Sequence, residues 1–449
     1  MLAGVISACG KSPLGHANSP PSDTAATSAA GEPSASVKAA LLPSVNPRPV
    51  GATARVGYLE GADRLRPFFQ ALAALDDHRR DDDVRILQFG DSHTASDLGT
   101  AVFRRILQGR FGDGGRGFVS IGRPWKTYTQ DGIVGAMSRD FEPERAHIED
   151  GHPVGDGFYG LLGVAIAASR RGARASSAVA ARSSRVEVGY FQTPGGGAFD
   201  FAVDGEIRAR VLTGAAEPGA GFMSVDMPDA PHELEVRVVG DGVVRVFGMA
   251  LDRAPAGVVV DALGINGAQI FTPLRVPEEP FAAQLRHRPP SLVVLAYGTN
   301  EALDPKLEIP QYEQALSDLI GRVARACPDT SCLLLGPPDL ARWSSTGGWA
   351  TFPRLLEIVA IQRRMAQAAG CAFYDQVGAM GGPGAMAAWA AESEPRAAHD
   401  RVHLTRRGYA QVAASFATDL MGAYDAFRAA APSARGVAHD VRPSAAPPP

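Results

Sequence analysis

Two hydrophobic periodicities divide the chain. From about 120 to 256, apolar and polar residues alternate, which is the pattern of half-buried β-strands. Elsewhere, short apolar runs end in glycine and are followed by segments with apolar residues three and four positions apart. That second pattern is typical of buried parallel strands that alternate with amphipathic helices. The sequence therefore predicts an α/β fold interrupted by an all-β segment.

The α/β part is expected to contain a parallel sheet covered by helices on both faces. Its apolar runs predict five strands, over 84–89, 258–263, 292–297, 332–335 and 372–374. The helical spacing predicts helices over 62–79, 97–111, 310–326, 351–369 and 406–428. Thr405 is expected to be the N-cap of the last helix.

The all-β part is expected to be an inserted β-sandwich of jelly-roll type. Its clearest strands are predicted at 185–191, 198–203, 206–211, 232–238 and 243–247. Asp204-Gly205 between two of them is a hairpin signal. The glycine-rich segment 112–118 is interpreted as a loop, because no Gly-Lys-Ser/Thr follows it as in a phosphate-binding loop.

Polar residues of the types that take part in catalysis follow several of the apolar runs. Gly90-Asp91-Ser92-His93 ends the first predicted strand, so Ser92 is expected at the carboxyl edge of the sheet, where α/β proteins hold their sites. This motif alone is weak evidence for a catalytic serine, since a turn with a capping serine has the same sequence pattern. Three later segments strengthen it: 264–267, 298–301 and 400–403.

These four blocks, in this order, resemble those of the SGNH (GDSL) hydrolase family. The resemblance implies a flavodoxin-like parallel sheet, with Ser92 as nucleophile and Asp400 and His403 completing a triad. It also implies oxyanion donors at Gly267, through its backbone, and at Asn300, through its side chain. The resemblance covers about 84–112, 258–340 and 371–425.

Elementary chemistry agrees with these roles. A serine hydroxyl needs a base within hydrogen-bond reach and a carboxylate that orients the base, which His403 and Asp400 can supply. The N–H groups of Ser92 and Gly267 and the Asn300 amide would stabilise the developing oxyanion, each contributing about 3–4 kcal/mol. Asp91 and His93 are expected to shape the substrate site. His93 is also the alternative base.

The implied activity is ester hydrolysis on a glycan. An SGNH domain with a GDSH block and an inserted β-sandwich resembles the bacterial peptidoglycan O-acetylesterases, which remove acetyl groups from O6 of muramic acid. Another acetylated glycan is an open alternative. So are a polysaccharide O-acetyltransferase, a lipase or lysophospholipase, and a non-enzymatic glycan-binding lipoprotein. The last would require a broken triad.

The two ends of the sequence predict where in the cell the protein is located. Ile6-Ser7-Ala8-Cys9 looks like a lipobox, so Cys9 is expected to carry lipid, with the true start further upstream; the alternative is a chance cysteine in a disordered leader. Residues 1–50 read as a tether and 431–449 as a disordered tail. The expectation is a bacterial periplasmic or outer-membrane lipoprotein, held to the membrane through Cys9 only. The remaining domain bounds are 51–119, 120–256 and 257–430.

Charge and cysteines limit the partners. The 449 residues carry a net charge of −4 with no long basic cluster, which argues against nucleic acid. No stretch approaches the ~20 apolar residues that would span a bilayer. Cys327–Cys332 and Cys332–Cys371 are both open as disulfides. No histidine lies at ligand spacing to these cysteines, so no metal is expected, and no cofactor.

Overall fold

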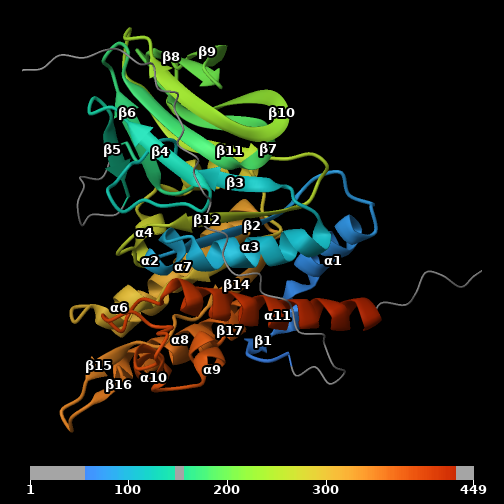
Figure 1. Ribbon diagram of the computed structural model, residues 1–449, viewed down its shortest axis with the longest axis vertical. Helices are drawn as coiled ribbons and strands as arrows, with labels where there is room; N and C mark the ends of the chain where they lie inside the picture. Colours follow the sequence, from blue (N-terminus) through green and yellow to red (C-terminus); the bar gives the residue numbers. More distant parts are fainter. Residues whose placement is uncertain (1–55, 147–155, 431–449) are drawn as a thin grey trace, which may run out of the picture. The chain divides into compact units, whose positions relative to one another are not determined.

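A six-stranded sheet, built from segments 59–90 and 258–374, is the centre of the α/β part in the computed structural model, which describes residues 56–146 and 156–430 (Figure 1). Its strand order is β1-β17-β14-β13-β2-β12. The strands are β1 (Leu59–Glu60), β2 (Val84–Gly90), β12 (Val258–Gly264), β13 (Leu292–Ala296), β14 (Ser331–Leu335) and β17 (Ala372–Tyr374). All pair in parallel except β1, which is antiparallel to β17. The predicted parallel sheet is thus present, with one short added edge strand.

Helices form a layer on each side of this sheet. One layer packs α1 (Arg66–Asp76), α3 (Leu98–Phe111) and α11 (Arg406–Ala430) together, and the other packs α5 (Glu278–His287), α7 (Ile309–Ala326) and α8 (Pro353–Ala369). Shorter helical segments are η1 (Ala62–Leu65), α2 (Ser92–Ala95), α4 (Phe271–Leu274), α6 (Thr299–Leu303), α9 (Gln376–Met380) and α10 (Ala385–Ala390). Each predicted helix has a counterpart, and Thr405 Oγ1 accepts from Gly408 N at 3.3 Å, as an N-cap does.

Between β2 and β12 along the chain lies a nine-stranded antiparallel sheet with its own apolar core. Its strands are β3 (Gly115–Val119), β4 (Ile133–Met137), β5 (Glu142–Arg145), β6 (Val164–Ala168), β7 (Arg174–Gln192), β8 (Ala198–Val203), β9 (Glu206–Leu212), β10 (Gly219–Val238) and β11 (Val244–Asp252). Asp204 and Gly205 join β8 to β9 with positive φ angles of 53° and 83°, which a tight hairpin turn requires.

The glycine-rich segment interpreted as a loop is a strand instead. Within it, β3 pairs with β11, and the Phe118 N–H donates to Asp261 Oδ1 of β12 at 2.7 Å. A Cβ on Gly117, whose φ is 84°, would lie 2.2 Å from that same Asp261 oxygen. The glycine is therefore needed for the close approach of β3 to β12. It does not mark a mobile connection.

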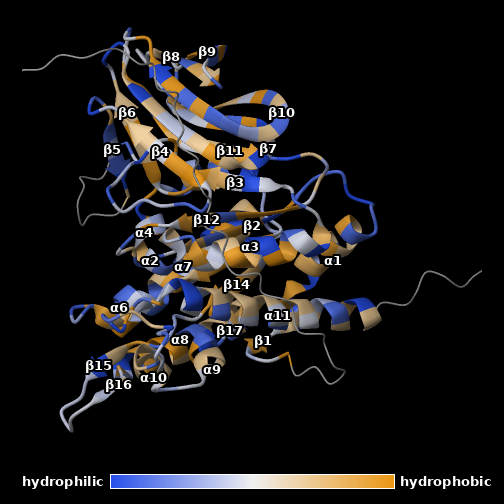
Figure 2. Cartoon of the chain, viewed as in Figure 1, coloured by the Kyte–Doolittle hydropathy of each residue, from blue (hydrophilic) through white to orange (hydrophobic). Residues whose placement is uncertain are grey.

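The two sheets share a buried interface. Phe118, Leu161 and Ala250 belong to one apolar cluster with Leu263 and Phe281 of the α/β part. Figure 2 shows hydrophobic residues along β2 and β12, on the side of the α/β part that meets this interface. Removing the nine-stranded sheet would expose this surface to water, at a cost of about 25 cal/mol per Å² of apolar area.

An ionic cluster crosses the same interface. Arg288 Nε donates to Asp261 Oδ2 and Arg288 Nη2 to Asp252 Oδ1, both at 2.9 Å. The guanidinium and Asp261 are buried, so each needs the other to offset its desolvation.

Of the two disulfides left open by the sequence, Cys332–Cys371 is formed, and it joins the neighbouring strand β14 to the residue before β17. Cys327 is a buried free thiol. Over the described ranges, no helix is both long and apolar enough to cross a membrane. The predicted leader, tether and tail, with Cys9, lie outside the described residues.

Candidate active site

Ser92 lies where β2 ends and the short helix α2 begins. Asp91 caps this helix, because its Oδ1 accepts the His93 N–H at 2.9 Å. The side chain of Ser92 is thereby turned out of the strand direction at the carboxyl edge of the sheet.

Two glycines let α2 lie directly against this edge. Gly90 and Gly264 are register partners at the ends of β2 and β12. A Cβ on Gly90 would lie 2.3 Å from Thr94 Oγ1, and one on Gly264 would lie 2.2 Å from Ala95 N. Both distances are far inside van der Waals contact, so a larger residue at either position would displace the helix that carries Ser92.

The structure brings Ser92, His403 and Asp400 together although 311 positions separate the first two. Ser92 Oγ lies 2.8 Å from His403 Nε2, and His403 Nδ1 lies 2.7 Å from Asp400 Oδ2. The second carboxylate oxygen of Asp400 accepts the backbone N–H groups of Val402 and His403 at 2.9 and 3.0 Å. Partial burial raises the pKa of Asp400, but these hydrogen bonds outweigh it and the pKa is lowered. Asp400 is therefore an anion that faces the imidazole.

His93, the alternative base, has a different partner. Its Nδ1 forms a 2.9 Å hydrogen bond with Tyr409 OH of α11, and its ring centroid lies 5.2 Å from that of His403. Burial and the nearby His403 lower the pKa of His93 to about 3, so its imidazole is neutral at ordinary pH. Within the described part of the chain, the buried Nε2 of His93 has no hydrogen-bond partner. The geometry assigns contact with the serine to His403.

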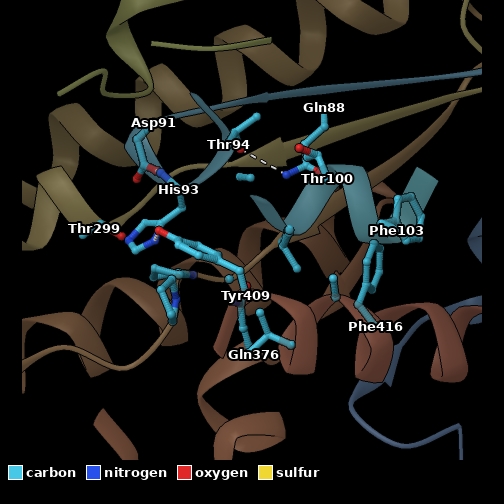
Figure 3. A pocket seen from close by; sticks show the side chains of 18 residues that line it. Gln88, Asp91, His93, Thr94, Thr100, Phe103, Thr299, Gln376, Tyr409 and Phe416 are labelled. Carbon is cyan, nitrogen blue, oxygen red and sulfur yellow. Dashed lines mark hydrogen bonds between the residues drawn. The ribbon is translucent and has the colours of Figure 1, made fainter. Parts of the chain in front are cut away.

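A small cavity of about 60 Å³ lies next to this site; Asp91 and His93 line it, and Ser92 does not (Figure 3). Asp91, His93 and Thr299 gather at one end of it, and Phe103 and Phe416 lie at the other. Burial raises the pKa of Asp91 to about 6. This cavity is well below the roughly 300–1,000 Å³ of pockets that enclose drug-sized ligands.

The predicted oxyanion residues lie on two adjacent loops. Asn300, at the start of α6, donates from Nδ2 to the carbonyl of Ala268, the residue after Gly267, at 2.9 Å. An amide nitrogen carries two hydrogens, so one remains for another acceptor.

Glu301 holds the segment after β12 to the segment after β13 through two hydrogen bonds, a role that the sequence did not reveal. One carboxylate oxygen accepts Gly298 N at 2.9 Å and the other accepts Ile270 N at 2.6 Å. The side chain is fully buried, and burial raises its pKa to about 7. The only sequence signal was the acidic residue directly after Asn300 in the segment 298–301.

Trp125 is a second residue that sequence reasoning missed. It lies between β3 and β4, and its Nε1 donates to Asn266 Oδ1 at 3.0 Å. The segment next to Gly267 is thereby fastened by a residue from outside the α/β part. No local pattern around Trp125 could have indicated a partner 141 positions away.

The arrangement is suited to nucleophilic catalysis by a serine. His403 Nε2 is within reach of the hydroxyl proton, and Asp400 fixes the orientation of the imidazole. Among the residues that the structure describes, no three His, Cys, Asp or Glu side chains converge to hold a metal ion.

Comparisons with known proteins agree with this chemistry. The GDSL-like lipase/acylhydrolase family model matches residues 201–411, which include Gly267, Asn300, Asp400 and His403. Ser92 lies outside the match, which begins within β8 of the nine-stranded sheet. No curated protein matches the chain significantly.

One solved structure shares most of the fold. It is described as a peptidoglycan O-acetylesterase in action, with 25% identity and a TM-score of 0.68, and the alignment covers 82% of this chain and 99% of that one. A family two carbohydrate esterase from Clostridium thermocellum with cellohexaose has 13% identity and a TM-score of 0.21, over 46% and 81% of the chains. An acetyl xylan esterase has 18% identity and a TM-score of 0.28, over 36% and 79%. Scores as low as these last two establish no common fold. From the family match over residues 201–411, the shared fold of the first structure and the resemblance of the four sequence blocks, we conclude that the chain is a carboxylic ester hydrolase that resembles the GDSL-like (SGNH) lipase/acylhydrolase family.

Proposed function

We propose that the protein is a serine esterase that removes O-acetyl groups from a cell-envelope glycan, with peptidoglycan acetylated at O6 of muramic acid as the substrate. The observation that carries the proposal is the hydrogen-bonded series Ser92–His403–Asp400, in a fold shared over 82% of the chain with a peptidoglycan O-acetylesterase.

In this mechanism Ser92 Oγ attacks the acetyl carbonyl carbon while His403 Nε2 takes the hydroxyl proton. The resulting imidazolium is stabilised by Asp400 and then gives its proton to the departing sugar oxygen. A water molecule, deprotonated by His403, attacks the acetyl-serine ester. Acetate leaves, and Ser92 recovers its proton.

The oxyanion would be held by the N–H groups of Ser92 and Gly267 and by the free hydrogen of the Asn300 amide. Neither backbone N–H has a hydrogen-bond partner within 56–146 and 156–430, which leaves both available to a ligand. Glu301 acts as a positioning residue for two of these donors, since it binds Ile270 N near Gly267 and Gly298 N near Asn300.

A short acyl group is favoured by the comparison, since the structure that shares most of the fold is described as a peptidoglycan O-acetylesterase. A lipase would need an extended apolar groove for its acyl chain. The acetyl specificity is therefore part of the proposal.

We further propose that the nine-stranded sheet is a β-sandwich inserted into the catalytic domain, carbohydrate-binding in type, with bounds near 120–256 between catalytic parts 51–119 and 257–430. The antiparallel pairing and separate core support this. The lipobox-like sequence before Cys9 supports a lipid anchor and a place in the periplasm or at the outer membrane.

The test is acetate release from O-acetylated peptidoglycan, compared with acetylated xylan and with a long-chain p-nitrophenyl ester. Ser92→Ala should abolish release, because triad residues contribute factors of about 10⁴ or more. Ser96→Ala is the matched control, since its hydroxyl donates to the backbone carbonyl of His93 and accepts the Leu98 N–H, and it has no part in the triad.

Three results would contradict the proposal. A Ser92→Ala protein that retains more than about 1% of the wild-type rate would remove the serine from the mechanism. Faster turnover of the long-chain ester would favour a lipase. Transfer of acetyl to an added sugar acceptor in preference to water would favour the transferase.

A further inference from the structure

The hairpin formed by β15 (Ala341–Trp343) and β16 (Trp349–Thr351) turns two tryptophans toward solvent. Trp343 and Trp349 are direct cross-strand partners, with ring centroids 5.5 Å apart and planes at 85°. Their side chains belong to residues that are 64% and 41% exposed. In Figure 1 this hairpin lies at the lower left, next to α10.

We propose that these two rings, the Trp343/Trp349 platform, form a sugar-binding subsite that stacks on a pyranose ring of the polymer next to the acetylated residue. The inference rests on the proposed function and names where the glycan is held. It places this contact on the α/β part, distinct from the nine-stranded sheet.

The platform is attached directly to the loop that holds the proposed base. The Ala341 N–H donates to the Arg401 carbonyl at 3.1 Å, and the Arg401 guanidinium lies 3.8 Å from the centroid of the Trp349 ring. Arg401 follows Asp400 and precedes His403 by two positions. Because consecutive Cα atoms are 3.8 Å apart, the contact point on this loop is at most about 8 Å of backbone from His403. A polymer whose ester lies at Ser92 therefore passes close to the hairpin.

Hairpin stability alone does not account for the exposure. An aromatic cross-strand pair contributes about 0.2–1 kcal/mol, and the edge-on contact between the rings supplies that. The contact between the two rings leaves most of Trp343 exposed to water, although burying such a side chain would be favourable. Arg401 covers part of Trp349, but among the residues that the structure describes, Trp343 has no ring or cation partner apart from Trp349.

The chemistry of the patch fits a sugar ring. The face of an indole is electron-rich and attracts the weakly positive C–H groups on the flat side of a pyranose. The turn between the strands supplies exposed Ser345 and Thr346, whose hydroxyls can bind sugar hydroxyls. A protein partner would need a contiguous apolar area of several hundred Å², and this small turn of serine, threonine and glycine does not provide it.

The test compares Trp343→Ala with Trp343→Phe and with Tyr58→Ala. Tyr58 is the matched control because it is an aromatic residue that is 43% exposed and precedes β1 at the edge of the α/β sheet, outside both the hairpin and the nine-stranded sheet. For each protein, kcat/KM is measured on O-acetylated peptidoglycan and on p-nitrophenyl acetate. We expect Trp343→Ala to lower the glycan-to-ester ratio of kcat/KM about tenfold through KM, Trp343→Phe to restore most of it, and Tyr58→Ala to keep the wild-type ratio.

Binding separates failure of the subsite from failure of the proposed function. Cosedimentation of the Ser92→Ala protein with the same sacculi needs no turnover, and adding Trp343→Ala should weaken it by a similar factor. A wild type that releases no acetate would overturn the proposed function, while this binding experiment would still decide the subsite. An unchanged ratio together with unchanged binding, or an equal loss in Tyr58→Ala, would overturn the subsite. Trp343-dependent binding to anionic lipid vesicles in place of sacculi would overturn it too.

Discussion

Replacing Asp400 by asparagine isolates the orienting role of the carboxylate from its role in the loop. Asparagine keeps an oxygen that can accept the Val402 and His403 N–H groups, now bound at 2.9 and 3.0 Å. Its NH₂ group takes the place of Oδ2, which lies 2.7 Å from His403 Nδ1. A donor there forces Nδ1 to be unprotonated, so the proton moves to Nε2 and faces Ser92 Oγ. The imidazole can then no longer accept the serine proton.

The size of the effect follows from the burial of the pair. The same change in the buried aspartate of a serine protease lowers kcat about 10⁴-fold. Here the side chains of Asp400 and His403 are 49% and 41% exposed, so water can solvate either tautomer. We expect a loss of about 10³-fold in kcat, or ~4 kcal/mol. His403→Ala, which removes the base itself, should lose more.

The assay is kcat on p-nitrophenyl acetate, with the melting temperature as the measure of loop integrity. Asp400→Ala is the companion variant: it also removes the two loop hydrogen bonds, worth about 0.5–1.5 kcal/mol each, and should therefore lower the melting temperature more than asparagine does. An Asp400→Asn enzyme that keeps more than about a tenth of the wild-type kcat would refute the tautomer argument. An equal loss of melting temperature in both variants would refute the assignment of the loop hydrogen bonds.

Three other measurements probe the site and its support. Asn300→Ala should lower kcat by roughly 10²–10³ with KM little changed, because its amide acts on charge that exists only in the transition state; a pure KM effect would point to substrate binding. The pKa of Glu301 is raised from 4.5 to about 7 in the folded protein, so folding favours its protonated form and wild-type stability should fall as pH rises from about 4.5 to 7. The melting temperature of Glu301→Gln relative to that of the wild type should therefore rise over this pH window. Melting temperatures of the two proteins that change in parallel with pH would contradict the pKa shift. Cys332 and Cys371 are separated by 39 positions, so replacing both by serine should lower the free energy of unfolding by up to ~4 kcal/mol in urea titrations, and no change would show that the bond does not form.

The sequence predicted the features that depend on local burial. The apolar runs before Ser92 and Asn300 are strands because both sheet faces are covered, and that leaves an unbroken hydrophobic signal. Where glycine replaces apolar side chains, as in β3, the signal is lost although every residue of the strand is buried. The contacts of Glu301 and Trp125 join distant segments, and no periodicity encodes them. The disulfide pairing could not be predicted, because the order of the strands in the sheet, which makes β14 and β17 neighbours, does not follow from the sequence of either strand.

The place of the nine-stranded sheet in the chain has a consequence for the order of folding. β2 lies between β12 and β13, and both of these partners are synthesised only after the whole intervening sheet. At a synthesis rate of 5–20 residues per second, the nucleophile strand waits about ten seconds or more without either neighbour. Its apolar residues must be shielded through that interval, and such nonlocal pairing folds slowly. β2, the strand that leads to Ser92, is thus synthesised early and paired late. Ser92 can contact His403 only when almost the entire chain has emerged from the ribosome.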